Sequence, residues 1–194
     1  MADGLTAYTA LGSRADGKLK THGVAAAVLL SEVAPSAMID VRLDPADTAA
    51  LNAVQQALAL DLPLTPNKTS AAAARIAWWL GPDQWLVVAP PAEAAALFQA
   101  LDTTARSAVD VSDLRAEFEL AGPRAVDVLR KGCGIDLHPR AFGPGDCALT
   151  ALARVRVGIR QVDGRPAYRV LVERSVAPYL WDWLVDAMRE FIGG

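Results

Sequence analysis

Residues 75–89 read RIAWWLGPDQWLVVA, and this stretch decides the fold class. Its two ends, residues 75–80 and 85–89, are apolar runs of strand length rich in Ile, Val and Trp. Between them stand Gly81, Pro82, Asp83 and Gln84, residues that are typical of a four-residue hairpin loop. The stretch therefore predicts an antiparallel hairpin, which needs further elements to cover its apolar side chains.

The residues on either side of the hairpin predict a strand and two helices. Residues 39–43 alternate apolar and polar side chains, as a half-buried strand does. Asp44 is the expected N-cap of a helix with Pro45 at its first position. The buried stripe of that helix consists of Leu51, Val54 and Leu58. A second helix is expected after the hairpin, over residues 91–101.

The same order of elements is expected again further along the chain. The second set comprises a strand at 115–120, a helix from Gly122 to Gly132, a hairpin formed by 151–162 and 167–173, and a helix at 176–191. Residue identity between the two sets is weak, so the repeat is one of order. We predict an α+β fold with two pseudo-repeated strand-helix-hairpin-helix units, each with an antiparallel sheet.

The expected division of the chain follows from this repeat. Residues 1–22 lack a periodic pattern and predict an N-terminal arm. Residues 23–108 form the first predicted unit and residues 109–194 the second, the two packed as one compact domain. This length can bury a sizeable core without disulfides.

Composition excludes several classes of protein. The net charge of −3 gives no basic field for nucleic acid, and no apolar run approaches the roughly 20 residues that cross a membrane. Cys133 and Cys147 fit neither a disulfide framework nor a metal-ligand spacing, so we expect both to be reduced and buried. We expect a cytoplasmic protein.

Motifs for catalysis are missing from the sequence. The two histidines, His22 and His138, stand in no nucleophile or metal pattern, and no GxSxG or GxxxxGK[ST] motif occurs. Gly132-Cys133-Gly134 resembles the start of GxGxxG, but Leu137 occupies the third glycine position, which favours a helix C-terminus. We predict no catalytic, cofactor-binding or metal site in this chain. A stand-alone enzyme whose site forms only in space remains a further hypothesis.

Charged residues alternate along two of the predicted strands. Arg154, Arg156 and Arg160 share one side of a strand whose hairpin partner carries Arg169, while Arg115, Glu117 and Glu119 share one side of another strand. Opposite charges would pair across a solvated sheet face if these strands are neighbours. Alternatively, the guanidinium groups would bind an anionic ligand or an acidic partner surface.

The tryptophans indicate a surface for a partner. Trp78 and Trp79 are adjacent on a strand and must point to opposite sides of the sheet. Trp181 and Trp183 flank the apolar stripe of the last helix and widen it beyond what one core face needs. Since Trp is frequent at interface hot spots, we predict a partner interface at these four residues, with burial in the chain's own core as the alternative.

Short segments from residue 80 onward resemble the gamma subunit of heterotetrameric sarcosine oxidase. These segments are LGPDQWL at 80–86, DVS at 110–112, GCGIDLHP at 132–139, FGPG at 142–145 and YLWDWL at 179–184. The resemblance implies a non-catalytic subunit with an assembly role, partnered by alpha, beta and delta subunits. It implies that the whole enzyme oxidatively demethylates sarcosine to glycine. FAD, FMN, NAD, tetrahydrofolate and zinc would all lie in the other subunits.

A weaker resemblance links the chain to the folate-binding aminomethyltransferase, or T-protein, family. DVS at 110–112, Gly122-Pro123 and IDL at 135–137 resemble the corresponding run of that family. Residues 148–160 lack its glycine pair and its acidic residue, so the catalytic residue does not carry over. This resemblance implies the T-protein fold, and it leaves a folate-like small-molecule binding protein as the alternative function.

Overall fold

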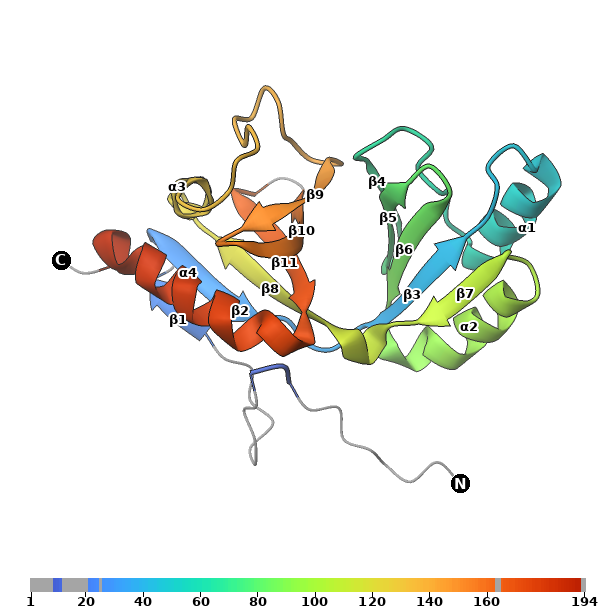
Figure 1. Ribbon diagram of the computed structural model, residues 1–194, viewed down its shortest axis with the longest axis horizontal. Helices are drawn as coiled ribbons and strands as arrows, with labels where there is room; N and C mark the ends of the chain where they lie inside the picture. Colours follow the sequence, from blue (N-terminus) through green and yellow to red (C-terminus); the bar gives the residue numbers. More distant parts are fainter. Residues whose placement is uncertain (1–8, 12–20, 25, 163–164, 193–194) are drawn as a thin grey trace. The chain divides into compact units, whose positions relative to one another are not determined.

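The computed structural model describes residues 9–11, 21–24, 26–162 and 165–192, and their strands form two sheets (Figure 1). In spatial order the six-stranded sheet consists of β1 (Thr21–Val24), β2 (Val28–Glu32), β8 (Arg115–Ala121), β11 (Ala167–Glu173), β10 (Val155–Gln161) and β9 (Cys147–Leu152). The five-stranded sheet consists of β4 (Thr69–Ala72), β5 (Arg75–Gly81), β6 (Gln84–Ala89), β3 (Ala37–Arg42) and β7 (Ser107–Asp110).

Four helices accompany the described strands. They are α1 (Thr48–Leu58), α2 (Ala94–Asp102), α3 (Ala125–Arg130) and α4 (Ala177–Ile192). Short 3₁₀ turns precede α2 and α4, at Pro91–Glu93 and Arg174–Val176, and a third lies at Ser112–Leu114. Among the described residues, no helix combines the length and the apolar character that a bilayer crossing requires.

Four strands of each sheet share one topology, which confirms the predicted α+β fold with a repeated order. The spatial order β3-β6-β5-β4 of one sheet corresponds to β8-β11-β10-β9 of the other. In each set, one helix follows the strand that comes first in the chain: α1 follows β3, and α3 follows β8. Another helix follows the strand that comes last in the chain: α2 follows β6, and α4 follows β11. Within these two sets of four strands, the predicted order missed β4 and β9, because neither carries the run of bulky apolar residues that marks a strand.

The chain divides differently from the expected boundaries. Residues 36–113 and 138–149 form one compact unit, whereas 114–137, 150–192 and the described residues up to Pro35 form the other. The expected first unit, 23–108, thus included β2, which pairs with β8. The expected arm also ended too late, since β1 begins at Thr21; residues 1–8 and 12–20 lie outside the described residues. Pairing between strands this far apart in sequence leaves no local pattern.

The helix after β3 begins three residues later than expected. Asp47 is its N-cap, and its Oδ1 accepts a hydrogen bond of 3.0 Å from the Ala50 N–H. Asp44 instead closes the preceding turn, where its Oδ1 accepts from the Ala46 N–H at 2.9 Å. Two aspartates three residues apart both satisfy the local rule for a cap, and only the path of the turn selects between them. The predicted stripe is confirmed, because Leu51, Val54 and Leu58 are buried.

Each sheet has a helix-covered apolar face. In the five-stranded sheet this core joins β3, β5 and β6 to α1 and α2, with Leu97 and Leu101 of α2 buried in it. Trp85 is completely buried there, and its Nε1 donates a 2.8 Å hydrogen bond to the Pro63 carbonyl. In the six-stranded sheet, Phe118 of β8 meets Trp181 of α4 edge to face, with ring centroids 5.4 Å apart.

Candidate functional site: a charged cluster and four tryptophans

The predicted pairing of charges across neighbouring strands is confirmed on β8 and β11. Arg169 stands directly opposite Glu119 in the register of these strands. Its Nε lies 2.8 Å from Glu119 Oε2, and its Nη1 lies 3.4 Å from Glu117 Oε2. Arg165 adds a longer contact to Glu119, at 3.6 Å. Two carboxylates and two guanidinium groups therefore form one cluster, which we call the β8–β11 charge cluster.

The expectation that this face is solvated is wrong for the centre of the cluster. The side chains of Glu117, Glu119 and Arg169 are only 9%, 18% and 23% exposed. Burial raises the pKa of Glu117, while the nearby charges of Arg169 and Arg160 oppose that rise. A carboxyl group buried to this depth stays ionised only when a guanidinium group lies beside it. The alternating pattern predicted which residues share the face but not how deeply that face is covered.

The remaining arginines of the predicted row are arranged differently. Arg154 lies in the turn before β10, with a left-handed φ of 71°, and so is not part of the strand. Arg156 is exposed on β10, and Arg160 is half-buried. Because the guanidinium groups of Arg165 and Arg169 already contact carboxylates, the geometry favours charge pairing within the chain over a ready-made anion site.

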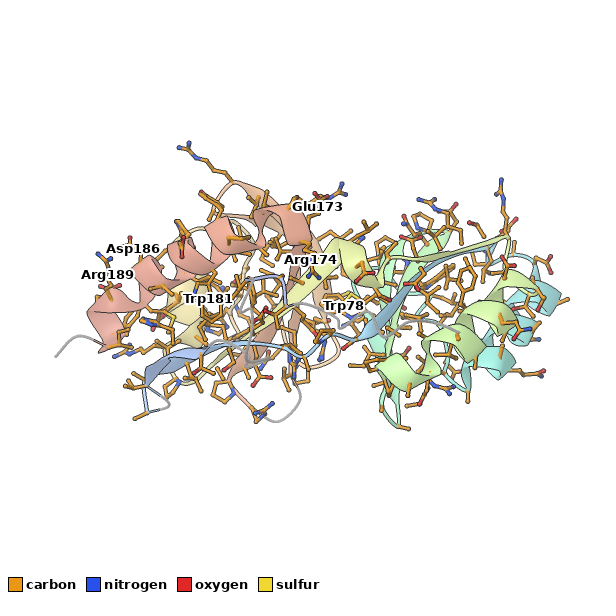
Figure 2. All side chains as sticks on the ribbon, turned by 90° about the horizontal axis from the view of Figure 1, so that it is seen from below. Trp78, Glu173, Arg174, Trp181, Asp186 and Arg189 are labelled. Carbon is orange, nitrogen blue, oxygen red and sulfur yellow. The ribbon has the colours of Figure 1, made fainter. Side chains whose placement is uncertain are left out.

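Two of the four tryptophans predicted at an interface are buried by the chain itself. Trp78 is 1% exposed and Trp181 is 7% exposed. Figure 2 shows Trp181 on the side of α4 that faces the sheet, whereas Asp186 and Arg189 lie on the other side of that helix. The prediction of a partner surface is therefore wrong for Trp78 and Trp181, and their alternative assignment to the core holds. The position of a residue on a strand or on the flank of a helix indicates where its side chain points, but not whether another element covers that side chain.

Trp79 and Trp183 are half-buried, so a partner interface there stays a prediction. Trp79 stands opposite Trp85 on β6, and its backbone N–H donates to the Lys68 carbonyl at 3.0 Å. Trp183 packs against Gly132, where an added Cβ would come within 2.6 Å of the indole. Part of each ring thus has a structural role already.

The glycine pair and the two cysteines lie where the sequence predicted. Gly132 and Gly134 follow the end of α3, where the Gly132 N–H donates to the Leu129 carbonyl, so the GxG stretch sits at a helix C-terminus. Cys133 and Cys147 are both buried, as expected, and they form no disulfide with each other. Within the described ranges, no three His, Cys, Asp or Glu side chains gather into a possible metal site.

One polar contact was not foreseen from the sequence. Lys68 pairs with Asp146, and the Gly143 N–H donates to the second oxygen of that carboxylate at 2.9 Å. Burial raises the pKa of Asp146, but the hydrogen bonds of Lys68 and of the Gly143 amide outweigh it and leave the pKa below its usual value. The Thr69 N–H and the Gly145 carbonyl also bond, at 2.8 Å. These contacts fasten the segment after α3 to the start of β4.

Known proteins of one family match most of the chain. The model of the sarcosine oxidase, gamma subunit family matches residues 42–190. The chain is 38% identical to the sarcosine oxidase subunit gamma of Arthrobacter sp. over 170 residues, which cover 86% of this chain and 83% of the relative. A weaker match, 33% over 119 residues, is to an aminomethyltransferase of Saccharopolyspora erythraea, and it covers 59% of this chain and 32% of that enzyme.

Solved structures agree with these sequence matches. A chain of the heterotetrameric sarcosine oxidase from Corynebacterium sp. U-96 aligns with a TM-score of 0.79 and 33% identity, covering 88% of both chains. The glycine cleavage system aminomethyltransferase T of Bartonella henselae aligns with a TM-score of 0.59 and 19% identity, covering 82% of this chain and 46% of that one, and so shares the fold. The resemblances found in the short segments are thereby confirmed, and the chain belongs to the sarcosine oxidase gamma subunit family.

Proposed function

We propose that this chain is the non-catalytic gamma subunit of a cytoplasmic heterotetrameric sarcosine oxidase that oxidatively demethylates sarcosine to glycine. Its role is structural, and its partners are the alpha, beta and delta subunits. The observation that carries the proposal is the match over 88% of both chains to a chain of a heterotetrameric sarcosine oxidase. The charge cluster supports a structural role as well, since its carboxylates and guanidinium groups contact one another.

We place the cofactors of the complex in the other subunits. FAD, FMN, NAD, tetrahydrofolate and zinc are the groups that the family resemblance implies. Nothing in the described part of the chain offers a cluster of metal-ligating side chains. The sequence likewise carries no glycine-rich phosphate loop.

The test is co-expression of a tagged chain with the genes that neighbour its own, followed by affinity purification and an absorption spectrum. A yellow complex containing larger flavin-bearing chains, with sarcosine turnover, is the expected result. Recovery of a colourless, stable chain without partners would contradict the assembly role. Stoichiometric flavin binding by the isolated chain would contradict the assignment of the flavins to other subunits.

A folate-like small-molecule binding protein is the second candidate, favoured by the shared T-protein fold and by the exposed Arg156 on β10. It predicts saturable binding of tetrahydrofolate by the isolated chain and a thermal shift on binding. An unchanged melting temperature at millimolar folate would count against this candidate and leave the subunit assignment intact.

A further inference from the structure

A groove runs between the C-terminal half of α1 and the edge strand β4. Its volume is about 410 Å³, and its lining residues are Asn52, Gln55, Gln56, Ala59, Leu60, Asp61, Ser70, Ala71 and Ala72. β4 is the last strand at one edge of the five-stranded sheet, next to β5 (Figure 1). One wall is therefore a helix face, and the other is a strand edge.

The register of β4 fixes which of its backbone groups face outward. The Lys68 carbonyl accepts from the Trp79 N–H of β5, so Lys68 bonds inward. Because antiparallel pairs alternate, Asn67, Thr69 and Ala71 must present their N–H and C=O groups to the outside. The Asn67 carbonyl and the Thr69 N–H do bond outward, to the backbone of residues 145–147.

This short outer ladder stops before Ala71. The Asp146 N–H donates back to the Gly143 carbonyl, and that turn carries the chain away from the edge. Ala71 is exposed, and no hydrogen-bond partner within the described ranges reaches its outward N–H and C=O. The edge thus presents an unused donor and acceptor in line with a ladder that has already begun.

The helix wall of the groove carries groups that suit a peptide backbone. Asn52, Gln55 and Gln56 each end in an amide, which offers donors and an acceptor together. Asp61 is the one charged residue among the nine that line the groove, so an acidic segment or a phosphate is disfavoured. On the strand side Ala71 and Ala72 carry only methyl groups, while the Ser70 hydroxyl donates to the Asp61 carbonyl.

We propose that an extended, uncharged or basic segment of a partner polypeptide adds to the edge of β4 in this groove. Its backbone pairs with Ala71, and the amides of Gln55 and Gln56 bond its outer side. This inference rests on the proposed function, since it needs the chain to assemble with other subunits. It adds the place and the mode of one contact.

The test uses the complex obtained by co-expression and compares three variants of this chain. Ala71→Pro removes the outward N–H at an edge position that accepts proline. Gln55→Ala combined with Gln56→Ala removes the helix amides without loss of helix propensity. Gln99→Ala, an exposed glutamine on α2 that does not line the groove, is the control. We expect the first two to raise the apparent dissociation constant of the complex about tenfold or more, and the control to leave it unchanged.

Hydrogen exchange supplies a second readout on the wild-type protein. The Ala71 amide is expected to exchange at least about tenfold more slowly in the complex than in the isolated chain. If the complex forms, all variants bind like wild type and Ala71 exchanges equally in both states, the docking inference is wrong and the proposed function stands. If no complex with larger chains forms at all, the proposed function fails and this inference fails with it.

Discussion

At the scale of single residues, Gly132 shows how one side chain can be excluded by a neighbour. A Cβ at Gly132 would lie 2.6 Å from Trp183 and 3.0 Å from the Ala153 backbone nitrogen. We expect Gly132→Ala to lower the free energy of unfolding by about 1–3 kcal/mol, measured by urea denaturation, because neither a ring nor backbone can yield cheaply. Gly134→Ala is the matched control, since nothing lies within 4 Å of a Cβ there. Equal effects of the two changes would show that Trp183 does not constrain this position.

Asp146 provides a pH-dependent test of a single contact. Its pKa is below the usual 3.8, so its ionised form stabilises the folded state above that pH, and the gain is lost as the pH falls through the lowered pKa. We expect Asp146→Asn to cost about 0.5–1 kcal/mol at pH 7, and the difference from wild type to vanish on acidification below 3.8. Denaturation series at several pH values measure both.

The control for Asp146 is Asp186→Asn. Asp186 pairs with Arg189 at 3.1 Å, but both side chains are more than two-thirds exposed. Such a pair contributes little to stability. A difference for Asp146→Asn that stays constant down to the lowest pH would contradict the assigned direction of its pKa.

At the scale of elements, the charge cluster joins β8 to β11. Arg169→Met leaves the buried Glu117 without the guanidinium group that contacts it, and a loss of about 3–5 kcal/mol in the free energy of unfolding is expected at pH 7. Glu117 already has a pKa raised above 4.5 by burial, and loss of Arg169 raises it further. The folded state then favours the neutral acid, so stability declines as the pH rises through that pKa.

Denaturation at pH 5 and pH 7 therefore separates this explanation from a simple packing loss. We expect Arg169→Met to be less destabilising at the lower pH. Adding Glu117→Gln should remove most of that pH dependence, because the most deeply buried carboxyl group of the cluster is then replaced by a neutral amide. A loss of equal size at both pH values would mean that the Arg169 stem, and not its charge, supports the pairing.

At the scale of the whole molecule, the chain crosses between its two units more often than the sequence repeat suggests. β2 pairs with β8, and α4 packs against both β1 and β2. A fragment of residues 109–194 lacks these partners, so we expect it to show no cooperative unfolding when it is expressed alone. Co-expression with a fragment of residues 1–108 should yield a soluble pair that purifies together. Independent folding of the 109–194 fragment would restore the boundary expected from the sequence.

The sequence alone determined the class of the fold, the repeated order of elements and the family. Local patterns carry this information: the alternation at 39–43 and 115–120, the hairpin at 75–89 and the stripe of α1 each depend on neighbours in the chain. The short segments from LGPDQWL onward pointed to the gamma subunit family, which the alignments confirmed.

Only the tertiary structure decided which segments meet and what they cover. In the structure, β1 and β2 belong to the same sheet as β8. Trp78, Trp181 and Glu117 are buried. Burial depends on contacts between residues far apart in sequence, and such contacts produce no periodic pattern in the sequence. The same holds for the outer edge of β4. Which backbone donor lacks a partner depends on the complete order of strands in the sheet, and that order is set by the tertiary structure.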